Sequence, residues 1–211
     1  MVWIQTRTGR AFDLMHPTPD MIDIIGDVAP ALALINRFTG HAGYPGPALS
    51  GHSVAQHSIL GSDALLAETG RSELALAFLL HDAHEFAIGD ISSPVAATFE
   101  ALLGPEFKNV LTLLKWTIDQ AIHAHLGLPF PWPEGVRAAV KEMDLRMLHA
   151  ERAWLMTKSP KPWSTDGWAV APVRSLTWRE FLPMTPKTAA REWLNRLAAL
   201  MPTTIPGGGN G

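Results

Sequence analysis

The sequence predicts a mainly α-helical protein with a small β-hairpin at its N-terminus. Apolar residues recur at three- and four-residue spacing over several long segments, as in helices that pack against a core. Only residues 2–14, VWIQTRTGRAFDL, alternate around a Thr-Gly turn, which indicates a pair of strands. With 47% hydrophobic and 18% charged residues, the chain of 211 residues can bury the core of one compact domain.

The first helix is expected between the hairpin and a stretch rich in Gly and Pro. Asp20 or Asp23 can cap its N-terminus, and Pro30 either kinks it or starts its second part before the helix ends near Phe38. The loop TGHAGYPGPALSGH (39–52) follows. Connections of this length without regular structure are often functional.

The remaining helices follow from apolar periodicity and from start and stop signals. Ser53 is expected to cap the next helix and Gly70 to end it. The segment SELALAFLLHDAHEFA (72–87) is apolar nearly all round, which predicts a buried helix that ends before Gly89. Further helices are expected near 105–126, 134–157 and 187–200, with an irregular Pro- and Trp-rich segment at 160–186 and a disordered tail at 201–211.

Composition excludes several classes of function. The chain has no cysteine, so disulfides and thiolate metal sites are excluded, and any metal must be held by His, Asp or Glu. A net charge of −3 without a basic stripe argues against duplex nucleic acid as a partner. We see no signal peptide and no apolar run near the ~20 residues of a membrane span. We therefore expect a cytoplasmic protein with no membrane partner.

The stretch LLHDAHEFAIGD (79–90) gathers histidines and carboxylates directly behind an apolar run. On a helix, Glu85 lies four residues after His81 and three after Asp82, so the three side chains share one region of surface. Burying unpaired carboxylates is costly, and a divalent cation would provide a partner for them. The alternative is a solvated helix end with His81 as a hydrogen-bonded core residue. This stretch alone leaves both interpretations open.

Three other blocks accompany it in a fixed order. They are NRFTGH (36–41), SVAQHS (53–58) and an Asp within VKEMDLRMLHAE (140–151), with HDAHEFAIGDISSP (81–94) at the centre. In these blocks the chain resembles the HD-domain metal-dependent phosphohydrolases, and within them the branch of 5′-deoxynucleotidases and short phage- and prophage-encoded hydrolases. The resemblance runs to about residue 155. It implies a single HD-domain helical bundle over residues 1–200, with a helical core at about 20–157.

The resemblance also implies a metal site. It makes His57, His81, Asp82 and Asp144 the ligands of one divalent metal ion. Two imidazoles and two carboxylates leave ~two positions of an octahedral ion for water and a phosphate oxygen. Mn, Co, Zn, Mg, Fe and Ni all remain open as the metal.

Catalytic and substrate-binding residues follow from the same resemblance. Glu85 matches the acid that orients the attacking water or handles its proton, and Asp90 matches a second acid in the proton network or on the sugar hydroxyl. Arg37 has the fork geometry to hold a phosphate, although it could also be a cation at a helix C-terminus. Phe38 is expected to stack on the sugar or base. His52 stands where such sequences often carry an aromatic residue, in the region that reads the substrate.

The function implied is hydrolysis of deoxynucleotides, in one of two modes. A dNMP would give nucleoside and phosphate, whereas a dNTP such as dATP would give nucleoside and triphosphate. An alternative from another class is a catalytically silent HD-fold module that binds nucleotides for regulation, against which the presence of both Glu85 and Asp90 argues. The expected partners are a small-molecule nucleotide and further copies of the chain, in a dimer or larger assembly. If the protein is phage-encoded, we expect it in the host cytoplasm.

Overall fold

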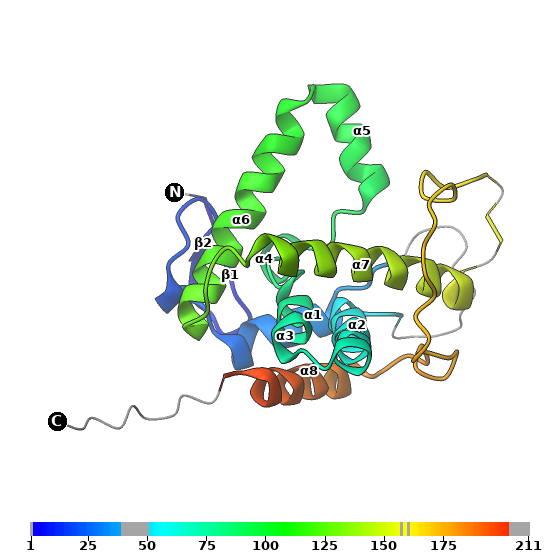
Figure 1. The fold of residues 1–211 in the computed structure, drawn as a ribbon. Helices are drawn as coiled ribbons and strands as arrows, with labels where there is room; N and C mark the ends of the chain where they lie inside the picture. Colours follow the sequence, from blue (N-terminus) through cyan, green and yellow to red (C-terminus); the bar gives the residue numbers. More distant parts are fainter. Residues whose placement is uncertain (1, 39–50, 157, 160, 203–211) are drawn as a thin grey trace.

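The computed structural model describes residues 2–38, 51–156, 158–159 and 161–202. The chain is mainly helical, with a two-stranded antiparallel sheet at the N-terminus, which confirms the predicted fold class (Figure 1). Strand β1 (Trp3–Gln5) pairs with β2 (Ala11–Asp13), so that Ile4 lies opposite Phe12. The Phe12 ring is fully buried and meets the Phe86 ring edge-on at 5.1 Å, so the hairpin closes one side of the core.

The first predicted helix forms as three short pieces. They are a 3-10 turn η1 (Pro19–Met21), a π-helical turn η2 (Ile24–Val28) and the helix α1 (Ala29–Leu34). Asp23 caps η2 by accepting a hydrogen bond from the Gly26 backbone N–H (2.8 Å), and Pro30 lies in the first turn of α1. The prediction that this helix reaches Phe38 is wrong. It ends at Leu34 because Ile35 is extended and its carbonyl accepts a hydrogen bond from Val54 N–H (2.9 Å).

Two predicted helix boundaries are confirmed in α2 (Val54–Thr69). The Ser53 side chain accepts a hydrogen bond from Gln56 N–H, and Gly70 adopts the left-handed conformation at the C-terminus with φ of 66°. The following helix, α3 (Ser72–Leu80), is buried from Leu74 onward. The two helices pack closely at Gly61, where an added Cβ would lie 2.1 Å from the Phe78 ring.

The predicted continuous helix over 72–87 is wrong, because it is interrupted at residues 81–84 before α4 (Glu85–Ile88) begins. The hydrogen bonds there tighten to three-residue spacing: His81 N–H donates to Phe78 O, and Glu85 N–H donates to Asp82 O. At this spacing residues i and i+3 are eclipsed, so Asp82 and Glu85 share one side of the turn. Gly89 then ends α4, as predicted.

The second half of the chain adds four helices among the described residues. Three were predicted: α6 (Glu106–Leu126), α7 (Glu134–Leu155) and α8 (Pro186–Leu200). The helix α5 (Ser93–Leu103) was not. Figure 1 shows α5 and α6 projecting from the body as a hairpin, with α7 crossing the body and α8 along its opposite side. Helix α8 contacts α1, α2 and α3, while α7 contacts α2 and α3.

The described residues between α7 and α8 have no helix or strand, as expected for the Pro- and Trp-rich segment. Gln56, fully buried in α2, anchors this segment. Its Nε2 donates to the carbonyls of Glu180 (3.1 Å) and Leu182 (2.8 Å), and its Oε1 accepts from Met184 N–H (3.1 Å). Most of the tail predicted to be disordered lies outside the described residues.

No single helix in the described part of the chain is both long and apolar enough to cross a membrane. Within the described ranges, the pair Ser72–Ile88 and Ser93–Leu103 meets the requirement by length and composition when taken together, and it is bent by 56° at the break.

Replacing Gly61 by Ala should lower the free energy of unfolding by about 1–3 kcal/mol, because the added methyl group overlaps the Phe78 ring. Thermal or urea unfolding measures this loss. The matched control is Gly135→Ala in α7, where an added Cβ meets no atom within 4 Å and should raise stability by up to about 1 kcal/mol. Equal stability of the two variants would contradict the close packing of α2 on α3.

Candidate active site

Four predicted metal ligands from three parts of the fold converge on one point. His57 comes from α2, His81 and Asp82 from the turn after α3, and Asp144 from α7. His57 Nε2 lies 3.2 Å from Asp144 Oδ1 and 3.9 Å from Asp82 Oδ2. His81 Nε2 lies 3.1 Å from Asp82 Oδ2 and 3.8 Å from Asp144 Oδ1. The structure therefore brings together the four residues that the sequence blocks single out.

The short distances between these nitrogens and oxygens do not have hydrogen-bond geometry. Both Nε2 atoms are buried and lack a hydrogen-bond partner among the described residues. The other nitrogen of each ring is engaged, because His57 Nδ1 lies 2.5 Å from Glu151 Oε1 and His81 Nδ1 lies 2.6 Å from Phe78 O. An N–H at Nδ1 leaves the lone pair of Nε2 facing the carboxylates, the arrangement typical of metal-ligating histidines. The donor set therefore fits a divalent cation bound by N and O ligands.

The electrostatics of the site favour positive charge. Burial would lower the pKa of His57 and His81, but the neighbouring carboxylates outweigh it and raise the pKa of both rings. Burial would likewise raise the pKa of Asp82 and Asp144, yet contacts with the imidazoles hold both below their usual range. Protons on the rings thus compensate a negative potential that a bound cation would also neutralise.

Glu151, which sequence reasoning missed as a site residue, links the cluster to its surroundings. Its side chain has no exposed surface, and Oε1 contacts both His57 Nδ1 and His52 Nε2 (3.0 Å). Oε2 lies 3.3 Å from Arg37 Nε. Burial would raise the pKa of Glu151, but His57 and Arg37 outweigh it and hold this pKa well below its usual range. Glu151 therefore stays ionised and fixes the orientation of the His57 ring.

Arg37 lies inside the site, as predicted for a substrate-binding residue. Residues 35–37 run beside the start of α2, where Arg37 N–H donates to His52 O (3.0 Å). Its guanidinium then reaches Asp82 (Nη1 to Oδ2, 3.2 Å) and Asp144 (Nη2 to Oδ1, 3.7 Å). Burial opposes the charge of Arg37, but the surrounding carboxylates raise its pKa, so the group is a fixed cation.

The other two predicted substrate-binding residues are turned into the protein. Phe38 is 9% exposed and packs in an apolar cluster with Phe78 and Phe181. The His52 side chain has no exposed surface and is held by Glu151. In this structure neither side chain offers a surface to a ligand. Most of the predicted loop 39–52 lies outside the described residues.

The two predicted catalytic acids lie beside the cluster. Glu85 is 3% exposed, and its Oε2 has no hydrogen-bond partner among the described residues. Burial first, and then the charges of Asp82 and Asp90, raise the pKa of Glu85 to about 9. Burial also raises the pKa of Asp90. Lys115 of α6, which was not predicted, lies close enough to lower the pKa of both acids, so a second cation faces this region.

His84, which lies between Asp82 and Glu85 in the interrupted segment, contacts α6. Its Nδ1 lies 3.1 and 3.2 Å from the two carboxylate oxygens of Asp119 in α6. Asp119 is one helical turn from Lys115, so one face of α6 borders both the turn at 81–84 and the acids. This contact fixes the turn against α6.

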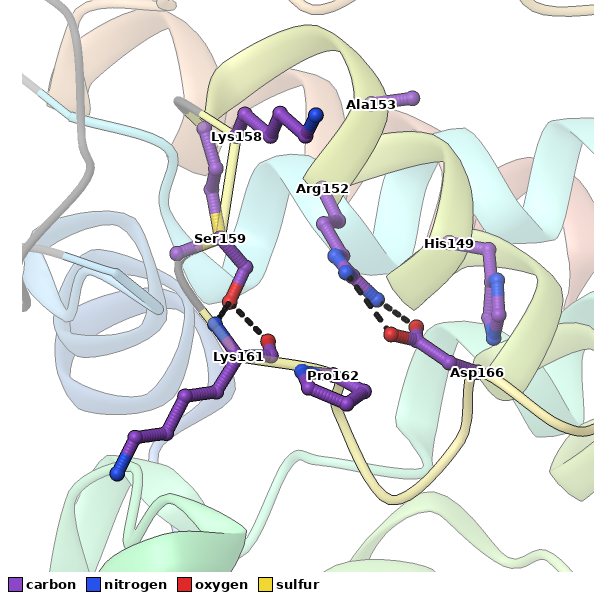
Figure 2. Close-up of a pocket in the computed structure, with 9 residues that line it drawn as sticks. His149, Arg152, Ala153, Lys158, Ser159, Lys161, Pro162 and Asp166 are labelled. Atoms are coloured by element: carbon purple, nitrogen blue, oxygen red, sulfur yellow. Dashed lines mark hydrogen bonds and ion pairs between the residues drawn. The ribbon is translucent and has the colours of Figure 1, made fainter.

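A hollow of about 740 Å³ lies beside the C-terminal end of α7 (Figure 2). Its wall includes Lys158 and an ion pair between Arg152 and Asp166, and Arg152 also lies over the Trp163 ring at 4.5 Å. None of its lining residues belongs to the predicted site. Among the described elements, the hollow and the four predicted ligands have α7 in common.

Comparison with known proteins finds relatives without a stated activity. No protein-family model matches the chain. The uncharacterized protein RCAP_rcc00048 of Rhodobacter capsulatus is 34% identical over 144 residues, which are 67% of each chain. The uncharacterized protein YfdR of Escherichia coli K12 is 33% identical over 152 residues, which are 72% of this chain and 71% of YfdR. Over this length such identity shows common descent, and the chain belongs to the family of RCAP_rcc00048 and YfdR.

Proposed function

We propose that the protein is a metal-dependent phosphohydrolase that acts on deoxynucleotides. The observation that carries the proposal is the convergence of two buried imidazole Nε2 atoms and two carboxylates at distances of 3.1–3.9 Å without hydrogen-bond geometry. The resemblance to HD-domain phosphohydrolases provides the substrate class, because the short enzymes with these blocks act on deoxynucleoside mono- or triphosphates.

His57, His81, Asp82 and Asp144 would hold one divalent ion. When bound, such an ion lowers the pKa of a water molecule and polarises a phosphoryl oxygen. The Asp144 side chain is 43% exposed, whereas His57 has no exposed side-chain surface, so the cluster opens toward solvent on the α7 side. A substrate phosphate would approach from this side.

The chain's own residues supply positioning and proton transfer. Attack of water on the phosphorus next to the sugar forms a P–O bond and breaks the bond to the 5′ oxygen, which must gain a proton. Glu85 keeps a proton at neutral pH, since its pKa is about 9, and can donate it to that oxygen. Arg37 would exchange one of its carboxylate contacts for the phosphate, which its planar fork binds in bidentate fashion. The same roles serve dNMP and dNTP substrates.

Glu85→Gln should reduce hydrolysis by at least about 100-fold, because the amide cannot transfer the proton. The assay is chromatography of products from dNMPs, NMPs and dNTPs incubated with Mn²⁺, Co²⁺, Mg²⁺ or Zn²⁺. Release of phosphate or of triphosphate by the wild type identifies the mode. Glu142→Gln, a matched change on an exposed part of α7, should leave the rate unchanged.

Two results of this assay would contradict the proposal. Full activity of Glu85→Gln would remove Glu85 from the mechanism. Absence of hydrolysis by the wild type with every pair of metal and nucleotide, together with nucleotide binding, would favour the regulatory module instead.

Glu151→Gln should weaken Mn²⁺ binding by about 10–100-fold, the usual effect of losing the carboxylate that orients a metal-ligating histidine. Isothermal titration calorimetry with Mn²⁺ measures the affinity directly and requires no turnover. Glu142→Gln again serves as the control. Wild-type affinity in Glu151→Gln would show that the contact with His57 Nδ1 does not support a metal site.

A further inference from the structure

The hairpin of α5 and α6 exposes many large apolar side chains. Seven of them, each 40–74% exposed, lie along its two helices: Val95, Phe99, Leu102, Leu103, Val110, Leu113 and Trp116. Figure 1 shows α5 and the first part of α6 standing away from the rest of the chain. The partners of α5 lie in α6, with Phe99 and Phe107 in ring contact at 5.1 Å. We refer to residues 93–117 as the arm.

The apolar residues of α6 in the arm extend beyond the face that meets α5 and the body. Phe107, Leu111 and Leu114 are partly buried and recur at the spacing of that face. Val110 lies at its edge and Leu113 about a third of a turn from its centre, and each is 63% exposed. This exposed apolar surface of α6 has no partner among the described residues.

The exposed area is large enough for an interface. Side chains of this size and exposure present on the order of 600 Å² of apolar surface, at the upper end of what the largest patch on a monomer shows. A stable protein–protein interface buries about 800 Å² on each partner. The seven side chains with the polar residues between them provide an area of this order.

The balanced charge of the arm favours a second copy of the chain as its partner over lipid or nucleic acid. Residues 93–117 contain Glu100, Glu106, Lys108 and Lys115, two of each sign. A surface that binds anionic lipid or nucleic acid carries an excess of Lys and Arg, which the arm lacks. Two neutral arms do not repel each other, and their apolar faces are alike, as an isologous twofold contact requires. We propose that the arm is a dimerisation surface, on which two copies of the chain pack α5 and α6 into a four-helix bundle.

The test measures the mass of the full-length protein by light scattering and sedimentation velocity, from about 1 to 100 µM. The wild type should be a dimer. Leu113→Glu and Leu102→Glu should each raise the dimer dissociation constant at least about 100-fold, because every dimer would bury two unpaired carboxylates. Both sites are exposed in a single chain, so neither substitution should disturb the fold. The circular dichroism spectra of the monomeric variants should therefore match the spectrum of the wild type.

The matched control is Ala97→Glu, which adds the same charge at an exposed position of α5 on the opposite side of that helix from Val95, Phe99 and Leu102, and should leave the dimer intact. A monomeric wild type at 100 µM would overturn the proposal, whether or not it binds vesicles of zwitterionic or anionic lipid. Dimers that persist in both leucine variants would also overturn it, since the contact would then lie elsewhere.

Discussion

The structure of the candidate site depends on one buried carboxylate, that of Glu151. It contacts an imidazole of α2 through His57 Nδ1, a second imidazole through His52 Nε2, and the guanidinium of Arg37. A lone buried carboxylate would be strongly destabilising, so these contacts are required for Glu151 to remain ionised in the core. In return, Glu151 fixes the ring of His57 with Nε2 toward the cluster and holds Arg37 beside it. Helix α7 thereby joins the segments that carry the predicted ligands.

The interruption of the helix at residues 81–84 determines how the acidic side chains of the site are oriented. Tightening of the backbone there turns Asp82 and Glu85 to one side, while His84 binds Asp119 of α6. Helix α5 begins three residues after Asp90, so the same short region leads from the acids into the arm. The site and the proposed dimer surface therefore share the base of the arm.

Local signals explain which parts of the structure could be predicted. The caps at Ser53 and Gly70 define α2, and the order of the sequence blocks singles out the four residues that converge. The break at 81–84 could not be read from propensity, because the preceding apolar run favours a continuous helix and tertiary contacts decide the outcome. Helix α5 was missed because its apolar residues do not face the core. Glu151 lies seven residues after Asp144, two turns along the same face of α7, and that spacing was the available signal.

The central claim is that His57, His81, Asp82 and Asp144 hold one divalent ion. Anomalous diffraction from crystals grown with Mn²⁺ tests it most directly, because the signal locates the ion independently of activity. The account predicts one strong peak between the two Nε2 atoms and the carboxylates of Asp82 and Asp144. Among the described residues, two other groups of side chains could hold an ion: His52, His57 and Glu151, or Asp82, His84 and Glu85. A peak at either group, or none at the four residues, would contradict the account.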